Sequence, residues 1–250
     1  MNNHFSLQHK TIFITGASSG IGKQACIECS AAGARIILNG RNEVKLKATF
    51  DLLPGNGHSI VCGDLSNAEF IEKVCQNLPQ IDGLVHAAGI MKLLPLKFIK
   101  PSFIDEIFNT NLRAPILLVS TLTRLKKINP HSSIVLISSI NGAVIGSLAN
   151  SVYGASKGGL QAFCKSSSLE LAKNNVRINC IAPGMVETAG VAKISSVVSA
   201  ESIENDKKKY PISRYGQPQD ISSACLFLLA SSSTWMTGTT LIIDGGYTAQ

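Results

Sequence analysis

The sequence predicts a single doubly wound α/β domain over residues 1–250, in which helices cover both faces of a seven-stranded, mostly parallel sheet. Its length of 250 residues fits one hydrophobic core, since open α/β sheets often reach this size. Hydrophobic residues make up 45% of the chain and charged residues 16%, so the chain can bury a large core. Short apolar runs alternate with longer helical patterns from end to end, as in successive βαβ units.

The expected strands are compact, β-branched runs bounded by turn or polar residues. In chain order they are Thr11–Ile14, Arg35–Leu38, Ser59–Val61, Gly83–His86, Ile134–Ser138, Arg177–Ile181 and Thr240–Ile243.

Helical patterns fill the segments between the strands. They are expected at Ile21–Ala32, Asn67–Asn77, Ser102–Lys127, Val152–Asn174 and Pro218–Ser231. Pro218 suits the first position of the last helix, where its missing N–H costs nothing. The segment Ala189–Tyr210 carries many serines and charges without a clean strand pattern. It is expected to be either a mobile lid or a pair of surface helices.

Targeting and disulfide signals are absent from the sequence. The first ten residues contain no apolar signal region, and no later stretch approaches the roughly 18 apolar residues of a membrane span. Seven scattered cysteines suit a reducing compartment. Cys26 and Cys29 form a lone C-x-x-C inside an expected helix, so we interpret them as packing residues rather than metal ligands. We expect a soluble, cytoplasmic protein without a membrane partner or a metal.

The net charge of +7 favours acidic partners, which include phosphorylated cofactors, acidic carrier proteins and nucleic acid. The densest basic run is Lys207–Lys209, and no aromatic residues alternate with it. It therefore fits a solvated face better than a nucleic-acid surface, and nucleic acid is not an expected partner.

A glycine-rich turn, Thr15–Gly22, follows the first expected strand and leads directly into a helix. Glycines let the backbone approach a pyrophosphate, and the positive end of the helix dipole then meets the negative charge. The spacing is G-x-x-x-G-x-G and not the common G-x-G-x-x-G. The turn therefore indicates a dinucleotide mainly through its position between strand and helix.

Further motifs follow this turn along the chain. They are Ala87–Gly89 after the fourth strand, Asn111, Ser139, Tyr153-x-x-x-Lys157, Pro183–Gly184 and the closing segment Gly238–Gly246. Together with the turn, they resemble the classical short-chain dehydrogenase/reductase family over essentially the whole chain. The resemblance implies a Rossmann-type fold and a nicotinamide-dependent oxidoreductase.

The form of the cofactor is expected to depend on the end of the second strand, Ile37–Asn42. No carboxylate stands there to bind the ribose 2′-hydroxyl of NAD. Arg41 can instead pair with the 2′-phosphate of NADP, so the sequence predicts NADP(H). The alternative is an exposed Arg41 that only begins the next helix. Lys23 or Asn42 would be the next candidates for the phosphate.

Tyr153 and Lys157 are the expected proton-transfer pair. Four residues apart on a helix, they share one face. The pKa of a free tyrosine is near 10, and a neighbouring cation favours the phenolate. A tyrosine and a lysine with this spacing are common on solvent-exposed helix faces, so the pair alone is weak evidence for catalysis. Ser139 ends the fifth strand, where doubly wound sheets bind ligands, and can donate to a developing oxyanion; Ser138 is the alternative.

Other roles are implied by the resemblance alone. Asn111 would hold a water that links Lys157 to solvent, or it is simply a buried asparagine bonded to backbone. Asp64–Leu65 would bracket the adenine. The Val186 backbone and the Thr188 side chain would contact the nicotinamide carboxamide.

The catalytic residues are therefore expected to be Asn111, Ser139, Tyr153 and Lys157. The expected cofactor-binding residues are Gly16, Ser18, Ser19, Gly20, Ile21, Gly22, Arg41, Asn42, Asp64, Leu65, Ala87, Ala88, Gly89, Tyr153, Lys157, Pro183, Gly184, Val186 and Thr188. His86 replaces an asparagine that is usual in the family, and we expect it to be a bonded packing group rather than a general base.

The predicted function is hydride transfer between NADP(H) and a carbonyl or secondary alcohol. The pattern Arg214–Asp220 and the final Asp-Gly-Gly resemble 3-oxoacyl-carrier-protein reductases, so a carrier-bound 3-oxoacyl thioester is one candidate substrate. Sugar, polyol and steroid dehydrogenases share the same motifs. A non-catalytic dinucleotide sensor is the alternative of another class, and a missing tyrosine or lysine would favour it. Family members are typically tetramers, so a homotetramer or homodimer is expected through the helices at Ser102–Lys127 and Val152–Asn174.

Overall fold

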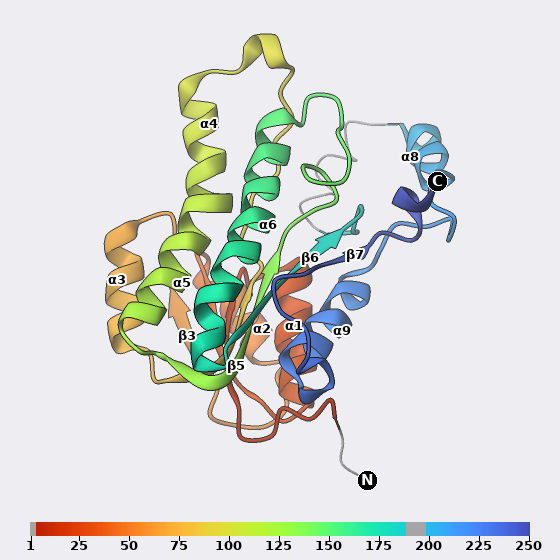
Figure 1. The fold of residues 1–250 in the computed structure, drawn as a ribbon. Helices are drawn as coiled ribbons and strands as arrows, with labels where there is room; N and C mark the ends of the chain where they lie inside the picture. The colour runs from red at the N-terminus through yellow and green to blue at the C-terminus, as the bar shows by residue number, and fades with distance from the viewer. Residues whose placement is uncertain (1–3, 189–198) are drawn as a thin grey trace.

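A computed structural model describes residues 4–188 and 199–250 of the chain (Figure 1). In these residues, a seven-stranded sheet has the order β3-β2-β1-β4-β5-β6-β7, and every neighbouring pair is parallel. The strands are β1 (Thr11–Thr15), β2 (Arg35–Gly40), β3 (Ser59–Cys62), β4 (Ile81–His86), β5 (Ile128–Ile137), β6 (Arg177–Pro183) and β7 (Thr240–Ile243). All seven expected strands are confirmed, and β5 begins six residues before the expected Ile134.

The order of the strands reverses beside β1. The chain builds β2 and β3 on one side of β1 and then crosses to β4 on the other side. At such a point the connections after two neighbouring strands leave in opposite directions, which opens a crevice at the carboxyl ends of the strands. The fold therefore places a ligand site beyond β1 and β4.

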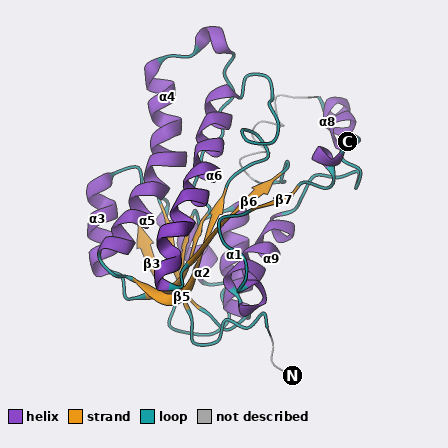
Figure 2. Ribbon diagram, in the orientation of Figure 1, coloured by secondary structure: helices purple, strands orange, loops and turns teal. Residues whose placement is uncertain are grey.

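Helices cover both faces of the sheet (Figure 2). Their bounds are α1 (Gly20–Ala31), α2 (Glu43–Phe50), α3 (Ala68–Asn77), α4 (Pro101–Phe108), α5 (Ala114–Arg124), α6 (Ser151–Leu171), α8 (Ala200–Lys207) and α9 (Pro218–Leu229). Short 3-10 turns lie at Leu96–Phe98, Ala172–Asn174, Ser231–Ser233 and Tyr247–Ala249. Across residues 4–188 and 199–250, no helix is both long and apolar enough to cross a membrane.

Alternating side chains of the strands feed two separate cores. In β1, Ile12 and Ile14 pack in the core under α1 and α9, whereas Phe13 packs in the core under α3, α5 and α6. This follows from the strand geometry, in which successive side chains point to opposite faces. Cys26 and Cys29 are free thiols buried in the first of these cores, as their interpretation as packing residues requires.

Helix α2 was not among the expected elements. Asn42 caps it, because its side-chain oxygen accepts a hydrogen bond from the Lys45 N–H at 2.9 Å. Only Leu46 and Thr49 of this helix are buried. Two buried positions in eight give too weak an apolar period to be recognised in the sequence.

The single helix expected at Ser102–Lys127 is divided by a π-helical turn, Asn109–Arg113, between α4 and α5. A regular helix would require residue 115 to donate its N–H to the Asn111 carbonyl oxygen, and Pro115 has no N–H to donate. The chain instead widens for one turn, and the Ala114 N–H reaches the Asn109 carbonyl. Such turns are frequent at functional sites. The two helices still form one continuous rod beside α6 (Figure 1).

The segment Ala189–Tyr210 is described only from residue 199 onward. This described part forms α8, which lies close to the C-terminal end of the chain (Figure 1). The Gln250 side chain donates to the Lys209 carbonyl oxygen at 2.6 Å, which ties the two together. Residues 189–198, on which the choice between a lid and a helix pair depends, lie outside the described residues.

Candidate active site

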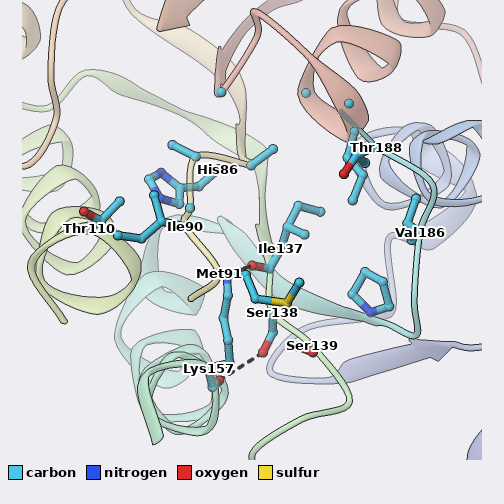
Figure 3. Close-up of a pocket in the computed structure, with 18 of the residues that line it drawn as sticks. His86, Ile90, Met91, Thr110, Ile137, Ser138, Ser139, Lys157, Val186 and Thr188 are labelled. Carbon is cyan, nitrogen blue, oxygen red and sulfur yellow. Dashed lines mark hydrogen bonds between the residues drawn. The ribbon is translucent and has the colours of Figure 1, made fainter. Parts of the chain in front are cut away.

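A cavity of about 520 Å³ lies at the carboxyl ends of the central strands. Ligand pockets typically have volumes of roughly 300–1,000 Å³, so a nucleotide and a small substrate fit this class of site. Every expected cofactor-binding residue except Asn42 lines the cavity, and so do the catalytic candidates Ser139, Tyr153 and Lys157. Asn42 and Asn111 are not among its lining residues. Figure 3 shows the cavity between the end of β4, α6 and the segment that carries Val186 and Thr188.

Two glycines of the glycine-rich turn, Gly16 and Gly22, are packed too tightly to carry side chains. A Cβ atom on Gly16 would lie 2.8 Å from the backbone of Ala87 and Ala88, and the φ of Gly16 is +67°. A Cβ atom on Gly22 would lie 2.4 Å from the Gly16 carbonyl oxygen. The N-cap Ser19 makes no side-chain capping bond, and no acidic residue lies in the first turn of α1. The turn therefore presents backbone N–H groups and a positive helix end to an anion, as a pyrophosphate requires.

Arg41 and Asp64 meet at the far end of the cavity, after β2 and β3. The Arg41 Nη1 and the Asp64 Oδ2 are 3.5 Å apart, and the two side chains are 67% and 46% exposed. Burial alone would raise the pKa of Asp64, but hydrogen bonds from Ser66 and the charge of Arg41 outweigh it and hold this pKa below its usual value. Asn42 caps α2 instead of lining the cavity, so the structure does not bring its side chain to the cofactor site beside Arg41 and Asp64.

Tyr153 and Lys157 lie one turn apart on α6. The Lys157 Nζ is 5.9 Å from the centre of the Tyr153 ring and donates to the Ile137 carbonyl oxygen at 2.7 Å. Lys157 is only 5% exposed, and its burial lowers its pKa to about 8. Burial raises the pKa of Tyr153, and a hydrogen bond with Ser139 opposes this rise. This hydrogen bond connects Ser139 with Tyr153, and both are catalytic candidates from the sequence.

The two serines at the end of β5 have different partners. The Ser138 hydroxyl donates to the Lys157 carbonyl oxygen at 3.0 Å and accepts from the Gln161 amide at 3.0 Å, which ties β5 to α6. The Ser139 hydroxyl accepts the Asn141 N–H at 3.1 Å and bonds to Tyr153. Ser138 is therefore occupied in holding the backbone, and Ser139 is the serine that faces the tyrosine.

Asn111 lies in the π-helical turn and clamps the loop after β4. Its side chain accepts the Ile90 N–H at 2.8 Å and donates to the Ile90 carbonyl oxygen at 2.9 Å, and it is 3.3 Å from the Ser156 hydroxyl. A Cβ atom on Gly89 would lie 3.3 Å from the Asn111 Oδ1 and 3.4 Å from the Lys157 Nζ. A Cβ atom at this position would be in tight contact with both groups, so Asn111 and Lys157 both lie against Gly89.

The segment after β6 is fixed against β7 and the chain before α9. The Gly184 N–H donates to the Ile243 carbonyl oxygen at 3.0 Å, and the Glu187 N–H donates to the Gly216 carbonyl oxygen at 2.8 Å. The Thr188 methyl group would lie 3.0 Å from a Cβ atom on Gly20. Thr188 therefore stands directly over the start of α1.

His86 also lines the cavity, and its surroundings differ from the expectation. It is 1% exposed, and its Nδ1 lies 3.1 Å from the Thr15 hydroxyl, as a bonded packing group requires. Its Nε2, however, has no hydrogen-bond partner among the described residues. Burial, followed by the charge of Lys157, lowers the pKa of His86 to about 3, so the imidazole is neutral.

The sequence analysis missed two tyrosines that line the cavity, Tyr210 and Tyr247. Their ring centres are 4.8 Å apart, and the Tyr210 hydroxyl accepts the Met185 N–H at 3.2 Å. Only the folded chain brings the C-terminal turn to the site, so no local pattern could have identified Tyr247. Within the described ranges, no three His, Cys, Asp or Glu side chains gather closely enough to bind a metal ion.

Comparison with known proteins places the chain in a family. The family model described as Enoyl-(Acyl carrier protein) reductase matches residues 16–248. The 3-oxoacyl-[acyl-carrier-protein] reductase FabG of Rickettsia bellii is 34% identical over 240 residues, which cover 96% of this chain and 97% of that protein. This chain belongs to the short-chain dehydrogenase/reductase family.

Other members of the short-chain dehydrogenase/reductase family support this result. Carbonyl reductase family member 4 of Danio rerio is 33% identical, over 93% of this chain and 95% of that protein. Among solved structures, a protein from Agrobacterium tumefaciens assigned as a 2-deoxy-d-gluconate 3-dehydrogenase, with bound NADP, aligns at a TM-score of 0.90 and 25% identity over 100% of both chains. As a family member, this chain is an oxidoreductase.

Proposed function

We propose that this chain transfers hydride between NADP(H) and a carbonyl or secondary alcohol, with Tyr153 as the proton donor to the carbonyl oxygen. The observation that carries the proposal is that Tyr153, Lys157 and Ser139 line one cavity with the glycine-rich turn. A sensor without activity would not need a buried lysine beside a buried tyrosine, because that arrangement only destabilises the fold. The intact group of residues therefore favours the enzyme over the sensor.

The residues of the cavity fit a phosphorylated dinucleotide. The backbone of Gly16–Gly22 would hold the pyrophosphate, and Val186 and Thr188 would hold the carboxamide of the nicotinamide. Positions 39–42 carry no carboxylate that would repel a 2′-phosphate, and Arg41 would bind it. The NADP in the related Agrobacterium structure supports this assignment. When bound, the nicotinamide supplies or accepts the hydride.

The chain's own residues would handle the proton. Negative charge develops on the carbonyl oxygen during reduction, and the Ser139 and Tyr153 hydroxyls are the donors available to it. Lys157, with a pKa of about 8, carries its charge at neutral pH and favours the phenolate that Tyr153 becomes after donating its proton. Asn111 would keep the loop after β4 in place and thereby fix Gly89 against Lys157.

Two substrate classes follow from the relatives and from the polar residues that line the cavity. The curated relatives favour a 3-oxoacyl thioester, either bound to a carrier protein or as a coenzyme A derivative. A hydroxylated sugar acid is the second candidate. The polar lining of the cavity favours it, because Asp206 lines the cavity and the Ser147 hydroxyl there donates to the Asn141 amide oxygen at 2.6 Å. The gluconate dehydrogenase names of the related structures favour it as well.

The experiment is a comparison of NADPH oxidation with acetoacetyl-carrier protein, acetoacetyl-coenzyme A and 2-keto or 3-keto sugar acids. A kcat/KM at least about a hundred times higher for the thioesters assigns the chain to acyl chemistry, and the reverse assigns it to sugar acids. Tight NADPH binding without turnover of any carbonyl would favour the sensor.

The protein is further proposed to act as a homotetramer or homodimer in the cytoplasm. Large apolar side chains remain exposed on the single chain, and Trp235 (100% exposed) and Leu169 are examples. Exposed apolar surface of this kind is usually covered by a partner. Gel filtration with light scattering tests the assembly, and a strict monomer would contradict it.

The free cysteines support a reducing compartment.

A further inference from the structure

The Tyr210 side chain is fixed in the wall of the cavity by two other aromatic rings. Its ring centre lies 5.6 Å from that of Tyr215 and 4.8 Å from that of Tyr247, and the residue is only 5% exposed. Ring contacts at these distances are favourable. The Tyr210 hydroxyl accepts the Met185 N–H at 3.2 Å. The ring contacts and this bond together hold the hydroxyl at Met185, in the segment that follows β6.

The proton of the Tyr210 hydroxyl has no acceptor among the described residues. The hydroxyl takes part in one hydrogen bond, in which the Met185 N–H is the donor. A phenol can donate as well as accept, and a buried tyrosine usually does find a partner for its O–H. The neighbouring Tyr215 shows the contrast, because its hydroxyl donates to the Asp206 Oδ2 at 2.7 Å. Tyr210 therefore keeps a donor for a group that is not part of the described chain.

The cavity is where such a group can reach this donor. Tyr210 and Met185 both line the cavity, whereas Tyr215 does not. Figure 3 shows Val186, the residue after Met185, on the other side of the cavity from Lys157. The free donor of Tyr210 therefore belongs to a wall that is separate from the group of catalytic candidates on α6.

The surroundings of Tyr210 keep its proton in place. Burial raises the pKa of Tyr210 to about 12, and the charges of Asp206 and Asp244 add to this rise. Tyr153 differs, because the ammonium group of Lys157 lies 5.9 Å from its ring centre. A phenol with a pKa so far above neutral is a hydrogen-bond donor and not a source of protons for the reaction. Tyr210 is thus suited to recognition, and proton transfer stays with Tyr153.

The charges around Tyr210 determine which kind of acceptor fits. The Asp206 carboxylate is paired with the Lys209 Nζ at 2.9 Å, but no cation pairs with Asp244 in the described part of the chain. Burial alone would raise the pKa of Asp244, but hydrogen bonds, mainly from Thr248, outweigh it and hold this pKa below its usual value. Asp244 is therefore charged at neutral pH and repels a second anion. An uncharged oxygen is the acceptor that these surroundings favour.

We propose that Tyr210 is a specificity-determining residue, whose hydroxyl donates to an uncharged oxygen of the substrate other than the reacting carbonyl oxygen. The inference rests on the proposed function and adds a second point of recognition to it. The ester or thioester carbonyl of a 3-oxoacyl compound supplies such an oxygen, and so does a hydroxyl of a sugar derivative. A substrate with a methylene group at this place leaves the buried donor unpaired, which enzymes discriminate against strongly.

The first test compares small methyl ketones as substrates of the wild-type enzyme at saturating NADPH. Ethyl acetoacetate and 2-heptanone differ in the ester group, 4-hydroxy-2-butanone and 2-pentanone differ in the hydroxyl, and acetoacetate carries a carboxylate. In at least one pair, kcat/KM should be at least about tenfold higher for the ketone with the second oxygen, and this pair identifies the source of the oxygen. Acetoacetate should be a poorer substrate than ethyl acetoacetate. Equal values within both pairs, or equal use of acetoacetate and its ester, would overturn the proposal.

The second test repeats these assays with Tyr210→Phe, which removes the hydroxyl and leaves the ring between Tyr215 and Tyr247. The value of kcat/KM should fall at least about tenfold for the preferred ketone and stay close to wild type for its matched ketone. A purely structural role, through the bond to Met185, would lower both values and the NADPH affinity together. An equal loss for the two ketones of a pair would therefore contradict the inference.

A binding experiment separates a failure of the inference from a failure of the proposed function. Ethyl 3-hydroxybutyrate and 1,3-butanediol cannot transfer hydride to NADPH, because both partners are already reduced. Their binding to the enzyme with NADPH, followed by the fluorescence of the nucleotide, is compared with that of 2-heptanol and 2-pentanol. Tighter binding of one oxygen-bearing alcohol than of its matched alcohol, lost in Tyr210→Phe, supports the inference even in an enzyme that reduces no ketone, and that lack of turnover contradicts the proposed function.

The opposite result contradicts the inference alone. In that case the enzyme reduces ketones, but the matched alcohols bind equally to the wild-type protein. This comparison needs no variant, so it decides against the inference even if Tyr210→Phe does not fold.

Discussion

Arg41 and Asp64 form an ion pair at the end of the cavity where the adenosine is expected, with the Arg41 Nη1 3.5 Å from the Asp64 Oδ2. The pair is largely exposed, so it contributes little to stability. If Arg41 binds the 2′-phosphate of NADP(H), as we propose, this pair would hold its guanidinium at the edge of the cavity.

Arg41→Ala should lower the affinity for NADPH by at least about tenfold and leave the affinity for NADH nearly unchanged, because only the 2′-phosphate loses a charge-assisted bond. Fluorescence titration of the nucleotides with each protein measures both values. Asn42→Ala is the control. Its side chain caps α2 and does not line the cavity, so this change should cost about 1 kcal/mol of stability and leave the nucleotide preference intact. An unchanged preference in Arg41→Ala would place phosphate recognition elsewhere.

Gly16→Ala should abolish detectable NADPH binding or unfold the turn. The added methyl group would lie 2.8 Å from the backbone of Ala87, at a φ of +67° that side chains rarely adopt. Gly146→Ala adds the same methyl group at a position with no other atom within 4 Å, so binding and melting temperature should stay close to wild type. Equal behaviour of the two variants in a calorimetric NADPH titration would argue against the tight turn.

Asn111→Ala should lower the free energy of unfolding by about 1–3 kcal/mol, because it leaves the half-buried N–H and carbonyl of Ile90 without their partners. It should also weaken NADPH binding, since the loop of Gly89 depends on this clamp. Asn77→Ala removes an exposed asparagine that bonds only to its own helix, and it should change stability by less than about 0.5 kcal/mol. Urea unfolding at equal protein concentration compares them. A stable Asn111→Ala protein would show that the clamp is dispensable.

The pH dependence of stability should reveal the buried lysine. The pKa of Lys157 is about 8 in the fold, against 10.5 for the ordinary side chain. Between these values the unfolded chain binds more protons than the folded one, so the free energy of unfolding gains from Lys157 as pH rises through this window. Lys157→Met removes the buried charge, should be more stable than wild type at pH 7 by on the order of 1–3 kcal/mol, and should lose this pH-dependent gain. A less stable variant would contradict the lowered pKa.

The sequence predicted the sheet because its strands are compact β-branched runs, which in β1, β2, β4 and β6 are almost continuously buried, and such runs are recognisable without tertiary information. The glycine-rich turn was equally readable, since its glycines are required by close backbone packing. Helix α2 was missed because its packing involves two residues only. The π-helical turn was not predicted, because the helical pattern continues through Pro115 and does not show where a single backbone donor is missing.

The site was predictable where function depends on residues close in sequence, as for Tyr153 and Lys157. It was less predictable where one local contact competes with another. Asn42 was expected at the cofactor, but the nearest open N–H groups belong to α2, which it caps. Tyr247 reaches the cavity only through the fold.

The most direct test of the proposed chemistry is NADPH oxidation with acetoacetyl thioesters of carrier protein and coenzyme A by wild type and Tyr153→Phe. The substitution removes one hydroxyl and leaves the ring, the cavity and Lys157 in place. If Tyr153 donates the proton, kcat should fall at least about a hundredfold while NADPH affinity is retained. Turnover by Tyr153→Phe at the wild-type rate would contradict the account.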